Sequence, residues 1–231
     1  MDQWWQRATA TNAPLDARVT AALALVAAAC ILWAPAWRAS RHVVTVAHEG
    51  AHGVVALLAG RSLSGIRLHS DSSGLTVSRG RARGFGMVAT LFAGYVGPGV
   101  LGLLLASVLH SGHAVAALWL LLGALTLLLL QIRNLYGLWV VLVSGIALFA
   151  VTWWLSDDVQ VGVAQTITWF LLLACPWSII DLQRTRRAGR GRGSDPDQLA
   201  RITPIPAGLW VTLMLLVALA CLGLGGWLML A

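Results

Sequence analysis

Charged residues are scarce in this 231-residue chain, and two of the usual kinds are nearly missing. Lysine is absent, so all sixteen basic residues are arginine, and Glu49 is the single glutamate beside eight aspartates. Charged residues make up 11% of the sequence, whereas a soluble domain has roughly a quarter. This shortage excludes a water-soluble globular protein and predicts an integral, multi-pass membrane protein surrounded by the lipid bilayer.

Cysteine is also rare. Cys30, Cys175 and Cys221 each lie inside an apolar stretch without metal-ligand spacing, so we interpret them as small packing residues.

The net charge of +7 could indicate a nucleic-acid partner, but the arginines lie in short segments between apolar stretches. That distribution is typical of loops facing an anionic membrane surface, and we therefore expect no nucleic-acid partner.

Apolar stretches dominate the rest of the chain. A helix needs about 20 apolar residues to cross the hydrocarbon core of a bilayer. The first stretch lacks a signal-peptide pattern and is expected to remain as a span. The chain is therefore predicted to be one all-α polytopic membrane domain over residues 1–231. We expect seven transmembrane helices, at roughly 19–37, 42–60, 85–109, 114–132, 135–155, 159–181 and 207–230.

The arginines also predict an orientation. With the N-terminus inside, fourteen arginines fall in inner segments, and the outer segments hold only Arg38 and Arg41. The positive-inside rule then indicates a cytoplasmic N-terminus in the plasma (inner) membrane. Two inner segments are long. Residues 62–80 are predicted to form a small cytoplasmic β-hairpin, and residues 184–206, rich in Arg, Gly and Pro, a mobile cytoplasmic linker.

The single glutamate belongs to an ionisable motif inside an apolar stretch, His48-Glu49-Gly50-Ala51-His52. On a helix, His48 and His52 share a face, so both imidazoles can bind one ion, and zinc suits neutral histidine ligands. Glu49 projects beside them as the predicted catalytic base, able to accept a proton from water and pass it to the leaving amine. Ionisable residues are costly within a membrane span, which indicates function.

A catalytic zinc site needs a third protein ligand and one open position. Asp181 is the first candidate for that ligand, because it lies in the inner part of another apolar stretch. Its alternative role is an ion pair with Arg184. Asn134 is predicted either to orient substrate or water or to cap a helix. We also expect the strand around Thr76 to present an unwound substrate segment by strand addition.

At these residues the chain resembles the site-2 protease family of intramembrane zinc metallopeptidases, in particular a short branch without accessory domains. The resemblance implies His48 and His52 as zinc ligands, Glu49 as catalytic base, and a membrane-inserted protein substrate cut within or near its own span. The matching elements occur in order as His48-Glu49-x-x-His52, Gly74-Leu75-Thr76, Gly94-Tyr95-x-Gly97-Pro98, Arg133-Asn134-x-Tyr136-Gly137, Ser178-x-x-Asp181 and Ser194-Asp195.

In one respect the chain departs from that family. The broader family places its third ligand in an Asp-Gly pair after an Asn-x-x-Pro run, and neither occurs here. Asp195 and Asn134 therefore remain alternatives to Asp181.

Two other functions fit the motif. A non-catalytic membrane scaffold would use it as a metal-stabilised helix contact, and a metal transporter subunit would use His and Asp along a path. The presence of Glu49 favours the enzyme, because a structural metal site needs no base beside its ligands.

Overall fold

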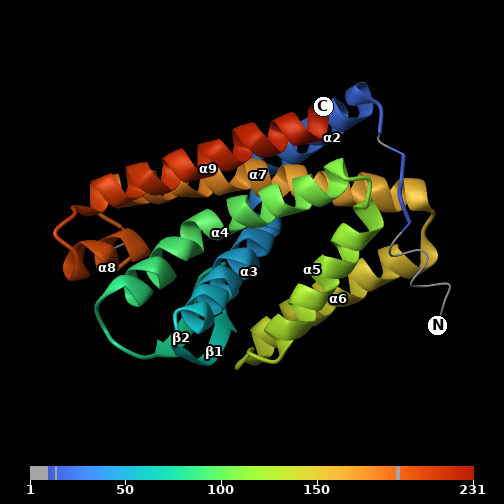
Figure 1. Cartoon of the computed structure of the whole chain (residues 1–231). Helices are drawn as coiled ribbons and strands as arrows, with labels where there is room; N and C mark the ends of the chain where they lie inside the picture. The colour runs from blue at the N-terminus through green and yellow to red at the C-terminus, as the bar shows by residue number, and fades with distance from the viewer. Residues whose placement is uncertain (1–9, 14, 191–192) are drawn as a thin grey trace.

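The computed structural model describes residues 10–13, 15–190 and 193–231. The chain forms a helical bundle with one two-stranded sheet at its side, which confirms the predominantly helical prediction (Figure 1). The elements follow one another as α2 (Ala17–Leu32), α3 (Ala34–Leu58), β1 (Ser62–Leu68), β2 (Gly74–Arg79), α4 (Phe85–His110), α5 (Ala114–Leu129), α6 (Leu135–Trp154), α7 (Asp157–Arg187), α8 (Asp195–Ile202) and α9 (Ala207–Leu230).

The number of membrane spans differs from the prediction of seven. Within the described ranges, the four helices α4, α6, α7 and α9 are long and apolar enough to cross a membrane. Helices α2 and α3 pass this test only as a pair, bent by 102° at the break around Trp33, and count together as a fifth span. Helix α5 has 16 residues, fewer than the about 20 needed. Seven separate spans are therefore not confirmed.

Helix α4 lies at the centre of the bundle, beside α3, α7 and α9 (Figure 1). Its glycines let the neighbouring helices approach closely. A Cβ on Gly97 would collide with the side chain of Ala51 in α3, and one on Gly102 would lie 3.0 Å from Cγ of Leu172 in α7. Because lipid is as apolar as these side chains, close packing rather than hydrophobic burial holds the helices together.

The hairpin of β1 and β2 folds back along α3. The antiparallel strands start just after the end of α3, and the tip returns to its first half, where Arg41 donates to the carbonyl of Asp71 and Thr45 donates to that of Ser72 at 2.8 Å. Seven strand residues span about 23 Å, close to the rise of α3 from Arg41 to Leu58 of about 25 Å. The hairpin thus lies beside the helix, so the structure does not support its predicted cytoplasmic location.

One edge of the hairpin is covered. The N–H of Ile66 in β1 donates to the carbonyl of Gln131 at 2.8 Å, and the N–H of Arg133 donates to the carbonyl of Ile66 at 2.9 Å. Asn134 continues this pairing with its side chain, which donates to the carbonyl of Leu68 at 2.7 Å and accepts from its N–H at 3.2 Å. In the part of the chain that the structure describes, no third strand pairs with β2.

The segment expected to be a linker, residues 184–206, contains the last turn of α7 and all of α8. Helix α8 is docked on the bundle. Leu199 is fully buried in a cluster that includes Ile179 of α7 and Met214 of α9. Asp197 forms an ion pair of 2.7 Å with Arg186, so α8 is fixed against the end of α7.

The start of the described chain lies at the opposite end of the bundle from α8. The N–H of Asn12 donates to the carbonyl of Gly112 at 2.7 Å, beside the connection between α4 and α5. The last turn of α9 lies at this same end of the bundle, because His110 contacts the carbonyl of Leu228 at 3.0 Å. The structure therefore does not support a cytoplasmic N-terminus on the same side as the arginine-rich segments.

Candidate metal centre

The two histidines of the motif meet on one face of α3, as their spacing predicts. Their Nε2 atoms lie 3.0 Å apart, and the side chain of His52 is almost fully buried. Nδ1 of His52 lies 2.7 Å from the carbonyl of Thr90 in α4. Because a carbonyl only accepts, Nδ1 carries the proton and the lone pair of Nε2 is free for a metal.

Asp195 completes a triangle with these histidines. One of its carboxylate oxygens lies 3.3 Å from Nε2 of His48 and 3.2 Å from Nε2 of His52. A tetrahedral zinc with ligands at about 2.0–2.1 Å has ligand-to-ligand edges of about 3.3–3.4 Å. The three observed distances are close to such edges. The donor set therefore fits zinc with three protein ligands and a fourth position open, and these residues could hold a metal.

Asp181 is placed differently from the sequence expectation. Asp181 is half-buried on α7 and lines the cavity that also contains the two histidines and Asp195. It does not belong to the group of ligand atoms formed by the histidines and Asp195. The alternative ion pair with Arg184 is not formed between these described residues either. The Arg184 guanidinium lies over the ring of Trp177 at 5.1 Å instead.

Asp195 reaches the histidines because α8 begins there. Ser194 is the N-cap residue and Pro196 follows within the first turn, a pairing that favours a helix start. Asp197 anchors this turn, since its carboxylate also accepts from the Ser194 hydroxyl at 2.9 Å. This capping pattern in the sequence indicates where α8 begins. It does not indicate which residues α8 contacts.

The environment of Asp195 favours its ionised form. Burial by itself raises the pKa of this carboxyl group. When His48 and His52 are protonated on both ring nitrogens, rather than neutral as a metal requires, their hydrogen bonds and charge outweigh burial and hold the pKa well below its ordinary value. Asp195 is consequently a carboxylate at neutral pH, the form that binds a cation.

Glu49 lies between the histidines and the hairpin. Its carboxylate is buried, with Oε1 4.0 Å from Nε2 of His48. The hydroxyl of Thr76 in β2 lies 2.6 Å from Oε2 of Glu49 and donates to it. A Cβ on Gly74 would lie 2.5 Å from Oε1, so only glycine leaves room for the carboxylate here. Thr76, expected to present substrate, thus directly contacts the predicted base.

The Gly94-Tyr95 part of α4 covers the imidazoles from the other side. A Cβ on Gly94 would collide with the ring of His52 and would lie 2.7 Å from Cε1 of His48. The ring of Tyr95 meets that of His48 edge-on, with centroids 4.7 Å apart. Sequence reasoning connected these residues only through the family resemblance, because their contact with the motif depends on how α4 packs on α3.

A cavity of about 650 Å³ joins these parts. Both histidines, Glu49, Asp181 and Asp195 line it, together with residues of β2 that include Thr76. Asn134 is not among its lining residues. Asn134 is the N-cap residue of α6, as one of the two alternatives predicted, but its side chain makes no capping hydrogen bond. It bonds instead to the backbone of Leu68, the partner of Gly74 across the hairpin. Asn134 therefore does not line the cavity and can affect the site only by holding the hairpin in place.

Comparison with known proteins gives one match. The model of the family described as Peptidase M50B-like, a site-2 protease family, matches residues 21–225, which contain the whole centre. No curated protein and no solved structure matches the chain.

Proposed function

Because this chain belongs to the Peptidase M50B-like family, we propose that it is a zinc-dependent intramembrane endopeptidase acting on membrane-inserted proteins in regulated intramembrane proteolysis. The observation that carries this proposal is the triangle of His48, His52 and Asp195 with the Glu49 carboxylate beside it. A metal-binding scaffold or transporter has no need of a buried carboxylate held next to, but outside, the ligand set.

The chain's own residues divide the chemistry between them. His48, His52 and Asp195 would hold the zinc ion, which when bound supplies a Lewis acid and lowers the pKa of water to about 7. Glu49 accepts the proton of the attacking water and donates it to the nitrogen of the leaving amine. Thr76 keeps the carboxylate aimed at the site, because its hydrogen bond fixes Oε2.

Strand β2 supports a substrate-binding role for the hairpin. It lines the cavity, and its outward side chains Leu75 and Val77 are 50% and 42% exposed, while Thr76 faces Glu49. A peptide bond inside a transmembrane helix is shielded and must be unwound before attack. An unpaired strand edge offers hydrogen bonds to such an extended segment and would hold it beside the predicted base.

Metal removal tests the proposed function. We expect about one zinc ion per chain after mild purification, and we expect a chelator to abolish cleavage of a membrane-inserted substrate until zinc is restored. Elemental analysis and cleavage in proteoliposomes measure both. Full cleavage by metal-free protein would contradict the proposal.

The proposed orientation places the arginine-rich end of the bundle at the cytoplasmic face of the plasma (inner) membrane. Cysteines introduced at Arg190 and Ser111, in a variant without native cysteines, should then react with impermeant reagents from the cytoplasmic and the outer side respectively. Both residues are exposed and lie just beyond the C-terminal ends of α7 and α4. Reaction of both from one side would refute this topology.

A further inference from the structure

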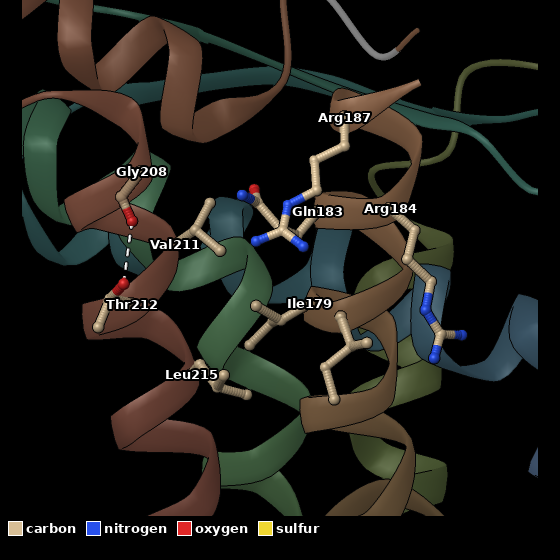
Figure 2. Close-up of a pocket in the computed structure, with 9 residues that line it drawn as sticks. Ile179, Gln183, Arg184, Arg187, Gly208, Val211, Thr212 and Leu215 are labelled. Atoms are coloured by element: carbon tan, nitrogen blue, oxygen red, sulfur yellow. Dashed lines mark hydrogen bonds between the residues drawn. The ribbon is translucent and has the colours of Figure 1, made fainter. Parts of the chain in front are cut away.

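A second cavity lies between α7 and α9 and shares no lining residue with the metal centre. Its volume is about 310 Å³. Figure 2 shows the two helices as facing walls, with Gln183 and Arg187 toward one end and Ile179 and Leu215 toward the other. The groove is therefore polar at one end and apolar at the other.

The polar end carries uncompensated positive charge. Arg184 and Arg187 both line the groove and are exposed, and no acidic residue lines it. Within the described residues the Arg187 side chain has no hydrogen bond or ion pair, whereas the neighbouring Arg186 is neutralised by Asp197. Figure 2 shows the Arg187 guanidinium between the two helices beside Gln183, whereas the Arg184 side chain extends away from them. The unpaired guanidinium of Arg187 therefore favours an anionic ligand.

The groove crosses the depth at which lipid headgroups meet acyl chains. Both of its walls belong to helices able to span a membrane. On α7 the arginines follow the apolar part of the helix, and on α9 the wall starts at Gly208, in the first turn. Arg187 therefore lies at headgroup level, and Ile179 and Leu215 lie deeper, beside hydrocarbon.

We propose that this groove binds one anionic phospholipid. Its phosphate would accept hydrogen bonds from Arg187 and Gln183, with Arg184 at the rim, and one acyl chain would cover Ile179 and Leu215. Arginine donors between membrane helices suit such headgroups. A free phosphate ion would satisfy only the polar end and leave the apolar end uncovered. The proposal goes beyond the peptidase activity and does not depend on it.

Lipid retention tests the proposal without measuring cleavage. Full-length protein, delipidated in detergent, is titrated with phosphatidylglycerol or phosphatidylcholine, and bound lipid per chain is measured by native mass spectrometry. We expect about one phosphatidylglycerol per chain and weaker binding of phosphatidylcholine. Arg187→Gln should weaken phosphatidylglycerol binding about fivefold, and combining it with Arg184→Gln should weaken it further.

Two further variants make the result specific. Arg201→Gln removes an exposed arginine from α8 outside the groove and should leave binding unchanged. Gly208→Phe adds a ring where no atom lies within 4 Å of the new Cβ, so it should obstruct the groove without a clash and reduce binding. Equal binding of both lipids, equal losses in the Arg187 and Arg201 variants, displacement by inorganic phosphate at the concentration of lipid, or no bound lipid would each overturn the proposal.

Discussion

Glu49→Gln is expected to abolish proteolysis and to leave zinc bound. Glutamine has nearly the same shape as glutamate but accepts no proton at neutral pH, and Glu49 does not belong to the ligand group. Loss of a general base typically costs 10²- to 10⁴-fold in rate, so we expect a loss on the order of 10³-fold. Cleavage of a reconstituted membrane-inserted substrate measures the rate, and elemental analysis of the same preparation measures the metal.

A milder change at Thr76 serves as the matched comparison. Thr76→Val removes the hydroxyl that donates to Oε2 of Glu49 and keeps the branched shape of the strand residue. We expect a rate loss of about tenfold with zinc retained, since one hydrogen bond to a charged group contributes about 1.5–3 kcal/mol. Thr76→Ser should restore most of the rate. Wild-type cleavage by the Glu49→Gln protein would remove Glu49 from the mechanism.

Asp195→Ala is expected to release the metal, and Asp181→Ala is expected to retain it. Both carboxylates line the same cavity, so each variant removes one carboxylate from the same cavity and the two can be compared directly. Only Asp195 lies within 3.3 Å of the histidine nitrogens. Loss of a residue that only hydrogen-bonds to a ligand costs about 10- to 100-fold in metal affinity, and loss of a direct ligand should exceed that range. Competition against a zinc indicator in detergent measures both affinities.

The opposite result would have a definite meaning. If Asp181→Ala lost zinc while Asp195→Ala kept it, α7 would supply the third ligand and α8 would lie elsewhere in the active protein. The Arg186→Gln variant helps to separate these cases. It breaks the ion pair that fixes α8 without touching a ligand, and should weaken zinc binding less than Asp195→Ala does.

The parts of the site that could be predicted from the sequence depend on local geometry. The spacing of His48 and His52 determines that they share a helix face, whatever the rest of the chain does. The hairpin was placed at residues 62–80, and its strands occupy 62–68 and 74–79, because turn-forming residues interrupt a strand-like composition. The family prediction is confirmed by the match over residues 21–225.

The parts that could not be predicted depend on packing between distant elements. The contact of Asp195 with the histidines exists only after α8 has docked through Leu199 and Asp197. Hydropathy along the chain likewise could not show that α2 and α3 form one bent pair, since it counts apolar residues and not the direction of the helix axis. The roles of Gly74 and Gly94 depend on space that neighbouring elements leave beside them.

The wide separation of the ligands has a consequence for biosynthesis. His52 and Asp195 are 143 positions apart, so the ribosome has delivered both histidines long before the carboxylate emerges. At about 5–20 residues per second this interval is on the order of ten seconds. During that time the nascent chain contains only two of the three proposed metal ligands beside the predicted base Glu49. On the proposed function, we therefore expect the growing chain to gain proteolytic activity only after Asp195 has been synthesised.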